Sequence, residues 1–196
     1  MEQTRDYKLL KRLRQTRVLV IDPDDQDRQT LIAHLKRIGC QTSTIWPVPT
    51  SLPDEVDVVF FLLNRLDEAK SLAWMATNEA ITRIAIIAYE TPEILAELER
   101  LHVHGVLSKP IRVFGVLSAL TTAIGVARHE GRLKQRIKSL DDTLKARRQI
   151  EKAVKILSSS KSISEEDAYQ RLRDRSMSSK TSISDLADAI IASDDI

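Results

Sequence analysis

The most regular pattern of apolar positions in this chain is a heptad repeat between residues 126 and 144. Val126, Leu133 and Leu140 lie seven residues apart, and Ile137 and Leu144 each follow a leucine by four residues. This spacing places one apolar stripe, here named the heptad seam, along a single helix and is typical of packing against a second helix. We therefore expect Val126, Leu133, Ile137, Leu140 and Leu144 to form the interface of a homodimer.

The repeat changes phase after Leu144. The next apolar residues are Ile150, Val154 and Leu157, which shifts the pattern by three residues. A shift of three redirects the buried face of a helix. We therefore predict one long helix with two tasks, in which residues 126–146 form a coiled coil and the part after residue 146 belongs to a small local bundle.

Two further helices are predicted near the C-terminus by capping-box patterns at Ser164–Asp167 and Ser182–Asp185. Apolar residues at helical spacing follow each pattern: Ala168, Leu172 and Met177 after the first, and Ile183, Leu186, Ala187 and Ile190 after the second. Together with the end of the long helix, they predict a three-helix domain over residues 147–196.

Upstream of the coiled coil, short apolar runs alternate with helical patterns. Strands are predicted at residues 17–22, 41–46, 57–63, 83–89 and 105–108, with helices at 24–38, 66–80, from Thr91-Pro92 to about 103, and from about 112 onwards. Five strands alternating with helices in this length predict an α/β fold, a flavodoxin-like doubly wound parallel five-stranded sheet. This sheet domain spans residues 1–125.

The net charge of +2 is unevenly distributed along the chain. Residues 1–125 hold 15 Lys+Arg and 16 Asp+Glu, residues 126–182 hold 15 and 8, and residues 183–196 hold four Asp and no basic residue. A basic segment of this kind is a common footprint of nucleic-acid binding, but a solvated helix face gives the same pattern. Charge alone leaves both interpretations open.

Other features exclude several classes of protein. No apolar run reaches the roughly 18–20 residues that span a bilayer, and the charged residues 1–17 do not form a signal peptide. Cys40 is the only cysteine, and His102 and His104 have no third ligand near them in sequence. We expect a cytoplasmic protein with no membrane contact, no metal site and no cofactor. Without a catalytic motif, it is not predicted to be an enzyme.

Residues 17–125 resemble the receiver domain of two-component signalling, in strand pattern and in the Lys109-Pro110 pair after the fifth strand. In receivers, acids after the first strand bind Mg²⁺, an Asp at the end of the third strand accepts phosphate, and a hydroxyl and a lysine contact the phosphoryl group. Here Asp22 and Lys109 match, whereas Leu62 stands at the acceptor position and Ala88 at the hydroxyl position. The resemblance therefore implies a degenerate receiver pocket that accepts no phosphate.

Three more acids follow the first strand. Asp24, Asp25 and Asp27 could be taken for a metal-binding cluster, but acids at the start of a helix also interact favourably with the helix dipole. We interpret them as helix-start residues.

The C-terminal region resembles a second family. Its pattern Arg147-x-x-Ile150-x-x-Ala153, then Ala168-Tyr169-x-x-Leu172-Arg173 and Leu186-Ala187, looks like the ANTAR domain, an RNA-binding module of bacterial antiterminators. The order of pseudo-receiver, coiled coil and ANTAR domain is similar to the AmiR-like family of amidase-operon antiterminators. That resemblance implies leader mRNA as a partner and a ligand-sensing protein as negative regulator.

Candidate RNA-binding residues come from the basic faces of this region. Arg148, Lys152 and Lys155 share one helix face, beside Arg147. The full set is Arg147, Arg148, Lys152, Lys155, Arg171, Arg173 and Arg175, with Ser178, Ser179 and Lys180 expected in a loop after the second short helix. The alternative is a DNA-binding response regulator with a degenerate receiver. Residues 158–182 do not show the helix-turn-helix signature with a tight glycine turn that this alternative favours.

Overall fold

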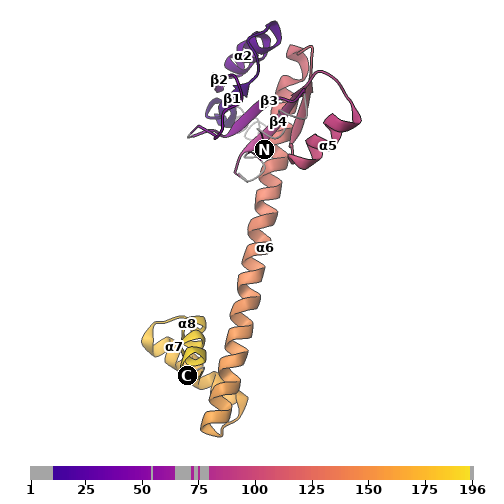
Figure 1. Cartoon of the computed structure of the whole chain (residues 1–196). Coiled ribbons are helices and arrows are strands. Elements are labelled where there is room, and N and C mark those ends of the chain that lie inside the picture. Colours follow the sequence, from indigo (N-terminus) through magenta and orange to yellow (C-terminus); the bar gives the residue numbers. More distant parts are fainter. Residues whose placement is uncertain (1–10, 54, 65–71, 73–74, 76–79, 195–196) are drawn as a thin grey trace. The chain divides into compact units, whose positions relative to one another are not determined.

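A five-stranded parallel sheet forms the core of the N-terminal part of the chain (Figure 1). The computed structural model describes residues 11–53, 55–64, 72, 75 and 80–194. The strands are β1 (Arg17–Ile21), β2 (Gln41–Ile45), β3 (Val58–Leu62), β4 (Thr82–Ile87) and β5 (Gly105–Ser108), in the order β2-β1-β3-β4-β5. All neighbours pair in parallel, which confirms the predicted receiver-like fold.

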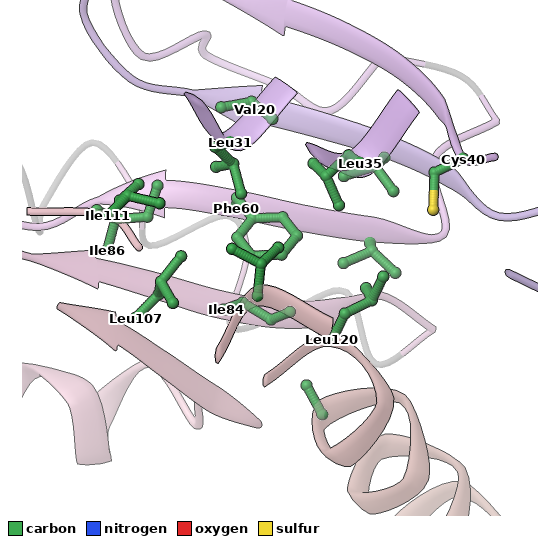
Figure 2. Packing of buried hydrophobic residues seen from close by; sticks show 14 of the residues in the cluster. Val20, Leu31, Leu35, Cys40, Phe60, Ile84, Ile86, Leu107, Ile111 and Leu120 are labelled. Carbon is green, nitrogen blue, oxygen red and sulfur yellow. The ribbon is translucent and has the colours of Figure 1, made fainter. Parts of the chain in front are cut away.

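The central strands are buried on both faces because their side chains are almost all aliphatic or aromatic. Successive residues contribute to two cores: Phe60 belongs to one, and its neighbour Phe61 to the other. Figure 2 shows Phe60 surrounded by side chains from the adjoining elements, among them Leu31 and Leu120. The edge strand β2 is more exposed than the central strands.

Helix α2 (Gln26–Ile38) begins two residues after the predicted start at residue 24 and ends at the predicted residue. Asp25 is the N-cap and accepts a hydrogen bond from the Arg28 N–H, and Gly39 ends the helix with a left-handed φ of 101°. Helix α5 (Pro92–Arg100) begins with Thr91 as N-cap, as predicted, and ends three residues earlier than expected. The helix predicted at residues 66–80 lies almost wholly outside the described residues.

Helix α6 (Val113–Lys161) is the long helix that the sequence predicts. Phe114 and Gly115 interrupt it near its start, and Val116, Leu120 and Ala123 then pack into the core of the sheet. Helix α6 lies close to β5 at this point. A Cβ added at Gly105 would lie only 3.2 Å from the Cβ of Ala123.

The C-terminal helices enclose a small core of their own. Helices α7 (Glu165–Ser179) and α8 (Ile183–Asp194) pack with the end of α6 around Ala153, Val154, Ala168, Leu172 and Ala187. Ser164 and Ser182 cap the two helices as predicted, through bonds from the Asp167 and Asp185 N–H groups. The chain divides into two compact units, Met1–Arg132 and Leu133–Ile196.

Two expectations for α7 are wrong. Met177 was expected in the core, but it is 69% exposed because it lies five residues after Leu172, about 140° round the helix from the packed face. Ser178 and Ser179 were expected in a loop, but they form the last turn of α7, where their hydroxyls donate to the Arg175 carbonyl at 3.0 and 2.7 Å. These bonds satisfy the serines inside the helix. Lys180 follows as the C-cap with a φ of 53°.

Candidate functional site

The degenerate receiver pocket lies at the carboxyl ends of the strands. Asp22 follows β1 and Lys109 follows β5, and the Lys109 Nζ donates to Asp22 Oδ1 at 3.1 Å and to Asp25 Oδ2 at 2.7 Å. Leu62 ends β3 with its side chain buried in the core, and the half-buried Ala88 follows β4. The structure thus joins Asp22 directly to Lys109, while Leu62 and Ala88 contribute no oxygen to the pocket.

The charges in this pocket stabilise one another. Burial raises the pKa of Asp22, and the hydrogen bond and charge of Lys109 offset part of that rise. Burial also acts to raise the pKa of Asp25, but bonds from Lys109 and the Arg28 N–H lower it overall. For Lys109, burial acts to lower the pKa, and the bonds and charges of Asp25 and Asp22 raise it overall. The ammonium group is therefore charged and fixed between two carboxyl groups.

The acids after β1 do more than begin a helix. Asp25 is the N-cap of α2, which confirms its predicted role, and it also binds Lys109. Asp27 accepts a hydrogen bond from the Ile111 N–H at 2.7 Å. Both contacts join the start of α2 to the segment after β5, and they were not predicted because the partners lie 84 residues apart in sequence.

The candidate RNA-binding residues of α6 are exposed on the C-terminal unit. Arg148, Lys152 and Lys155 occupy positions four and seven residues apart on a continuous helix, so their side chains leave it on one face. Arg147 is also exposed, and its Nε donates to Glu151 Oε1 at 3.0 Å. This face can offer several positive charges to a polyanion.

The three arginines of α7 do not form one face. Arg171 and Arg175 lie one turn apart, whereas Arg173 is roughly 200° round the helix from each of them. Arg173 instead shares its side of α7 with Tyr169 and Met177, which are 41% and 69% exposed. The sequence analysis missed this exposed apolar pair, although the spacing of four residues on each side of Arg173 is visible in the sequence.

Tyr169 also lines a groove between α6 and α7. The groove has a volume of about 810 Å³, and Ile150 and Val154 line its apolar part. Arg147 and Lys155 also line it, together with three acids, Glu151, Glu165 and Glu166. The groove therefore combines apolar side chains with charges of both signs.

The residues of the heptad seam are half-exposed in the single chain. Val126, Leu133, Ile137, Leu140 and Leu144 have exposed fractions of 46% to 59%. Such a regular apolar stripe in contact with water is what an unpaired coiled-coil helix presents. The dimer itself stays a prediction.

The histidines differ from each other. His102 is exposed, whereas His104 precedes the edge strand β5 and is buried. Its ring contacts Arg83 and Glu130. No helix of the described residues is long and apolar enough to cross a membrane.

Comparison with solved structures supports the receiver-like fold of the sheet unit. A CheY-like response regulator receiver domain protein from Methanospirillum hungatei JF-1 superposes with a TM-score of 0.51 at 13% identity, covering 59% of this chain and 98% of that one. This likeness shows the fold alone. Fold and pocket together define a receiver-like domain without the phosphate-accepting carboxylate.

Family comparison gives the more particular assignment. The family described as AmiR, N-terminal matches residues 16–124, and the ANTAR domain family matches residues 138–191. The chain belongs to the AmiR family, a family of transcription regulators rather than of catalysts. It is 29% identical over 188 residues to the aliphatic amidase regulator of Pseudomonas aeruginosa, an alignment that covers 95% of this chain and 96% of that one.

Proposed function

We propose that this protein is a transcription antiterminator that binds leader mRNA of an amidase-type operon and prevents a terminator from forming. The observation that carries the proposal is the set of exposed basic side chains on the unit that matches the ANTAR domain. The name of the Pseudomonas aeruginosa relative supports the choice of operon.

The chemistry of the basic faces supports RNA as the ligand. Arg148, Lys152 and Lys155 can bind phosphates in parallel, and arginine can also stack on bases that leave an RNA helix. Arg171, Arg173, Arg175 and Lys180 extend the positive charge over α7. Ser178 and Ser179 donate their hydroxyls to the backbone, so they would contact RNA only as acceptors.

Three functional segments follow from this proposal. Residues 1–125 form the pseudo-receiver, residues 126–146 form the coiled coil of a homodimer, and residues 147–196 form the RNA-binding domain. Such a protein acts on nascent transcripts, which places it in the cytoplasm.

The degenerate pocket supports control by a partner protein. Phosphoryl transfer to a receiver needs a carboxylate nucleophile, and Leu62 cannot supply one. Lys109 already occupies the space between Asp22 and Asp25. We therefore propose that a ligand-sensing protein, and not phosphorylation, silences the regulator until an inducer releases it.

A gel shift tests the central proposal. The full-length protein is titrated against leader RNA of the amidase-type operon and against duplex DNA of the same sequence, at about 50 and about 200 mM salt. We expect tighter binding to RNA. Equal or tighter binding to the duplex would overturn the proposal and favour the DNA-binding alternative.

A pair of matched variants locates the RNA face. Replacing Arg148, Lys152 and Lys155 with Ala should lower the salt slope of RNA binding by up to about three, because each lost phosphate contact removes about one. The control replaces Arg136, Lys138 and Lys145, which are exposed basic residues of α6 in the proposed coiled-coil segment. An equal loss in the control would mean that binding follows charge alone.

A further inference from the structure

One position of the heptad repeat carries a charge. Between Val126 and Leu133, the position four residues after Val126 is Glu130, whereas the equivalent positions one and two heptads later are Ile137 and Leu144. In a parallel pair of helices, equivalent positions of the two chains face each other. Glu130 of one chain would then approach Glu130 of the second copy, and two carboxylates at close range repel each other.

Glu130 occupies a seam position that is also close to the face of α6 packed on the sheet. At roughly 100° per residue, it is about 40° round α6 from Val126 and about 80° from Leu120, which packs on the sheet. The carboxylate of Glu130 can therefore turn either towards the seam or towards the sheet. Its environment decides between these two directions.

One side chain that meets Glu130 on the sheet side is His104. The Nε2 of His104 lies 3.3 Å from the Oε2 of Glu130. The His104 side chain is 4% exposed and that of Glu130 is 41% exposed. A buried group of the sheet unit thus reaches a half-exposed acid on α6, and both residues belong to the same compact unit.

The backbone of β4 fixes the proton on the His104 ring. The backbone N–H of Arg83 donates to His104 Nδ1 at 2.9 Å. The backbone N–H of His104 donates in turn to the Arg83 carbonyl at 2.8 Å. Because Nδ1 accepts a bond, the neutral ring carries its hydrogen on Nε2. The Nε2–H therefore points at the Glu130 carboxylate as a donor, without rotation or a change of tautomer.

The ring also stays neutral at ordinary pH. Burial lowers the pKa of His104, the positive charge of Arg83 lowers it further, and Glu130 opposes both effects. The guanidinium of Arg83 is itself bonded to the His102 and Met75 carbonyls. The contact is thus a hydrogen bond from a neutral ring to a carboxylate, and the ring brings no positive charge to the pair.

We infer that His104 is a positioning residue for the dimer: it holds the Glu130 carboxylate against the sheet unit and away from the heptad seam, so that the seam can pair with a second copy of this chain. The inference rests on the proposed homodimer. It adds that the pseudo-receiver determines how well the coiled coil forms, through one buried histidine that no step of RNA binding uses.

The dissociation constant of the full-length dimer, measured by sedimentation equilibrium at low salt, tests this inference. His104→Ala should weaken the dimer roughly fivefold, because the acid loses a partner on the sheet side and its repulsion across the seam increases. Glu130→Ala should leave the dimer as tight as the parent or tighter. Raising the salt concentration should reduce the His104→Ala deficit, since repulsion between exposed charges is screened.

A double-mutant cycle separates positioning from a general structural role. In a Glu130→Ala background, His104→Ala should have no further effect on the dissociation constant, because the charge that His104 positions has gone. A deficit of the same size in both backgrounds would overturn the inference. It would mean that His104 supports the fold and does not act through Glu130.

Two conservative variants give a matched comparison even where His104→Ala fails to fold. His104→Gln places an amide N–H near the position of Nε2 and should restore much of the dimer affinity. His104→Asn offers an acceptor near Nδ1 to the Arg83 N–H but cannot reach Glu130, so it should dimerise as weakly as His104→Ala. Equal affinity of the two folded variants would overturn the inference.

Leu140→Asp distinguishes failure of this inference from failure of the proposed dimer. If Leu140→Asp is a monomer while His104→Ala dimerises like the parent, the seam is the interface and the role of His104 is wrong. If the parent is monomeric, or if Leu140→Asp dimerises unchanged, the proposed coiled-coil dimer is wrong and the inference falls with it.

Discussion

The two units of this chain use their charged residues in opposite ways. In the sheet unit, Asp22 and Lys109 are withdrawn from solvent and bonded to each other. In the C-terminal unit, the basic side chains of α6 and α7 are exposed around a core of small aliphatic residues. A paired, buried charge contributes to the stability of the fold, whereas exposed basic side chains can contact a negatively charged ligand. The difference directs the search for RNA contacts to the C-terminal unit.

The largest loss of stability is expected where a buried, paired charge loses its partner. Lys109→Met removes the ammonium group and leaves the buried Asp22 carboxylate unpaired, which should lower the free energy of unfolding by about 3–5 kcal/mol. Thermal and urea denaturation of the full-length protein measure the change. The control is Lys138→Met at an exposed site of α6, where we expect a change within about 0.5 kcal/mol. Equal stability of the two variants would contradict the proposed role of the Lys109 pair.

A second prediction concerns the heptad seam, whose residues are neither buried nor fully exposed. Leu140→Asp places a charge where the second helix should pack, which should cost about 3 kcal/mol of dimer stability. Sedimentation velocity should then show a monomer. Gln135→Asp, at an exposed position outside the seam, should leave the dimer intact. A dimer in both variants would place the interface elsewhere, for example on the sheet unit.

The third prediction contrasts two apolar residues of α7. Leu172 is 3% exposed in the small core, so Leu172→Ala should lower the stability of the C-terminal unit by about 2 kcal/mol. Met177→Ala should change it by no more than about 0.5 kcal/mol, because that side chain is mostly in water. Urea denaturation followed by circular dichroism measures both changes. Similar losses would mean that Met177 is packed after all, against α6, α8 or a second chain.

The sequence predicted those features that depend on local patterns. Runs of apolar residues such as the one in β3 defined the strands, and Asp25 and Thr91 defined helix starts, since each acts on its own neighbours. The heptad seam was also predictable, because residues spaced by seven lie on the same face of a helix. Its exposure in the single chain fits the expected dimer interface.

Contacts between distant residues could not be predicted in the same way. Lys109 binds Asp22 across 87 residues, and nothing in either local sequence identifies the partner. His104 is a similar case, because its burial depends on the approach of α6 to β5. For Ser178 and Ser179, the local signal itself was misleading: a run of serines is typical of a loop, and here the helix satisfies their hydroxyls.

The smallest expected effect is a pH dependence that reports on His104. Its pKa in the folded protein is below the ordinary value, mainly through burial, so the folded state takes up a proton less readily than the unfolded state. The contribution of the neutral ring to stability is therefore fully present above about pH 6.5, the unfolded value, and is lost as the pH falls below it. One proton changes the free energy of unfolding by at most about 1.4 kcal/mol per pH unit.

Urea denaturation between about pH 7.5 and pH 5.5 isolates this contribution by comparing the parent with His104→Asn, which has no ring to titrate. His34, whose pKa is also lowered, by burial and by Arg37, is present in both proteins and cancels in the difference. We expect the parent to lose more stability than the variant as the pH falls. Parallel curves would mean that the His104 ring accepts a proton in the folded state as readily as in water, which its bond from the Arg83 N–H to Nδ1 argues against.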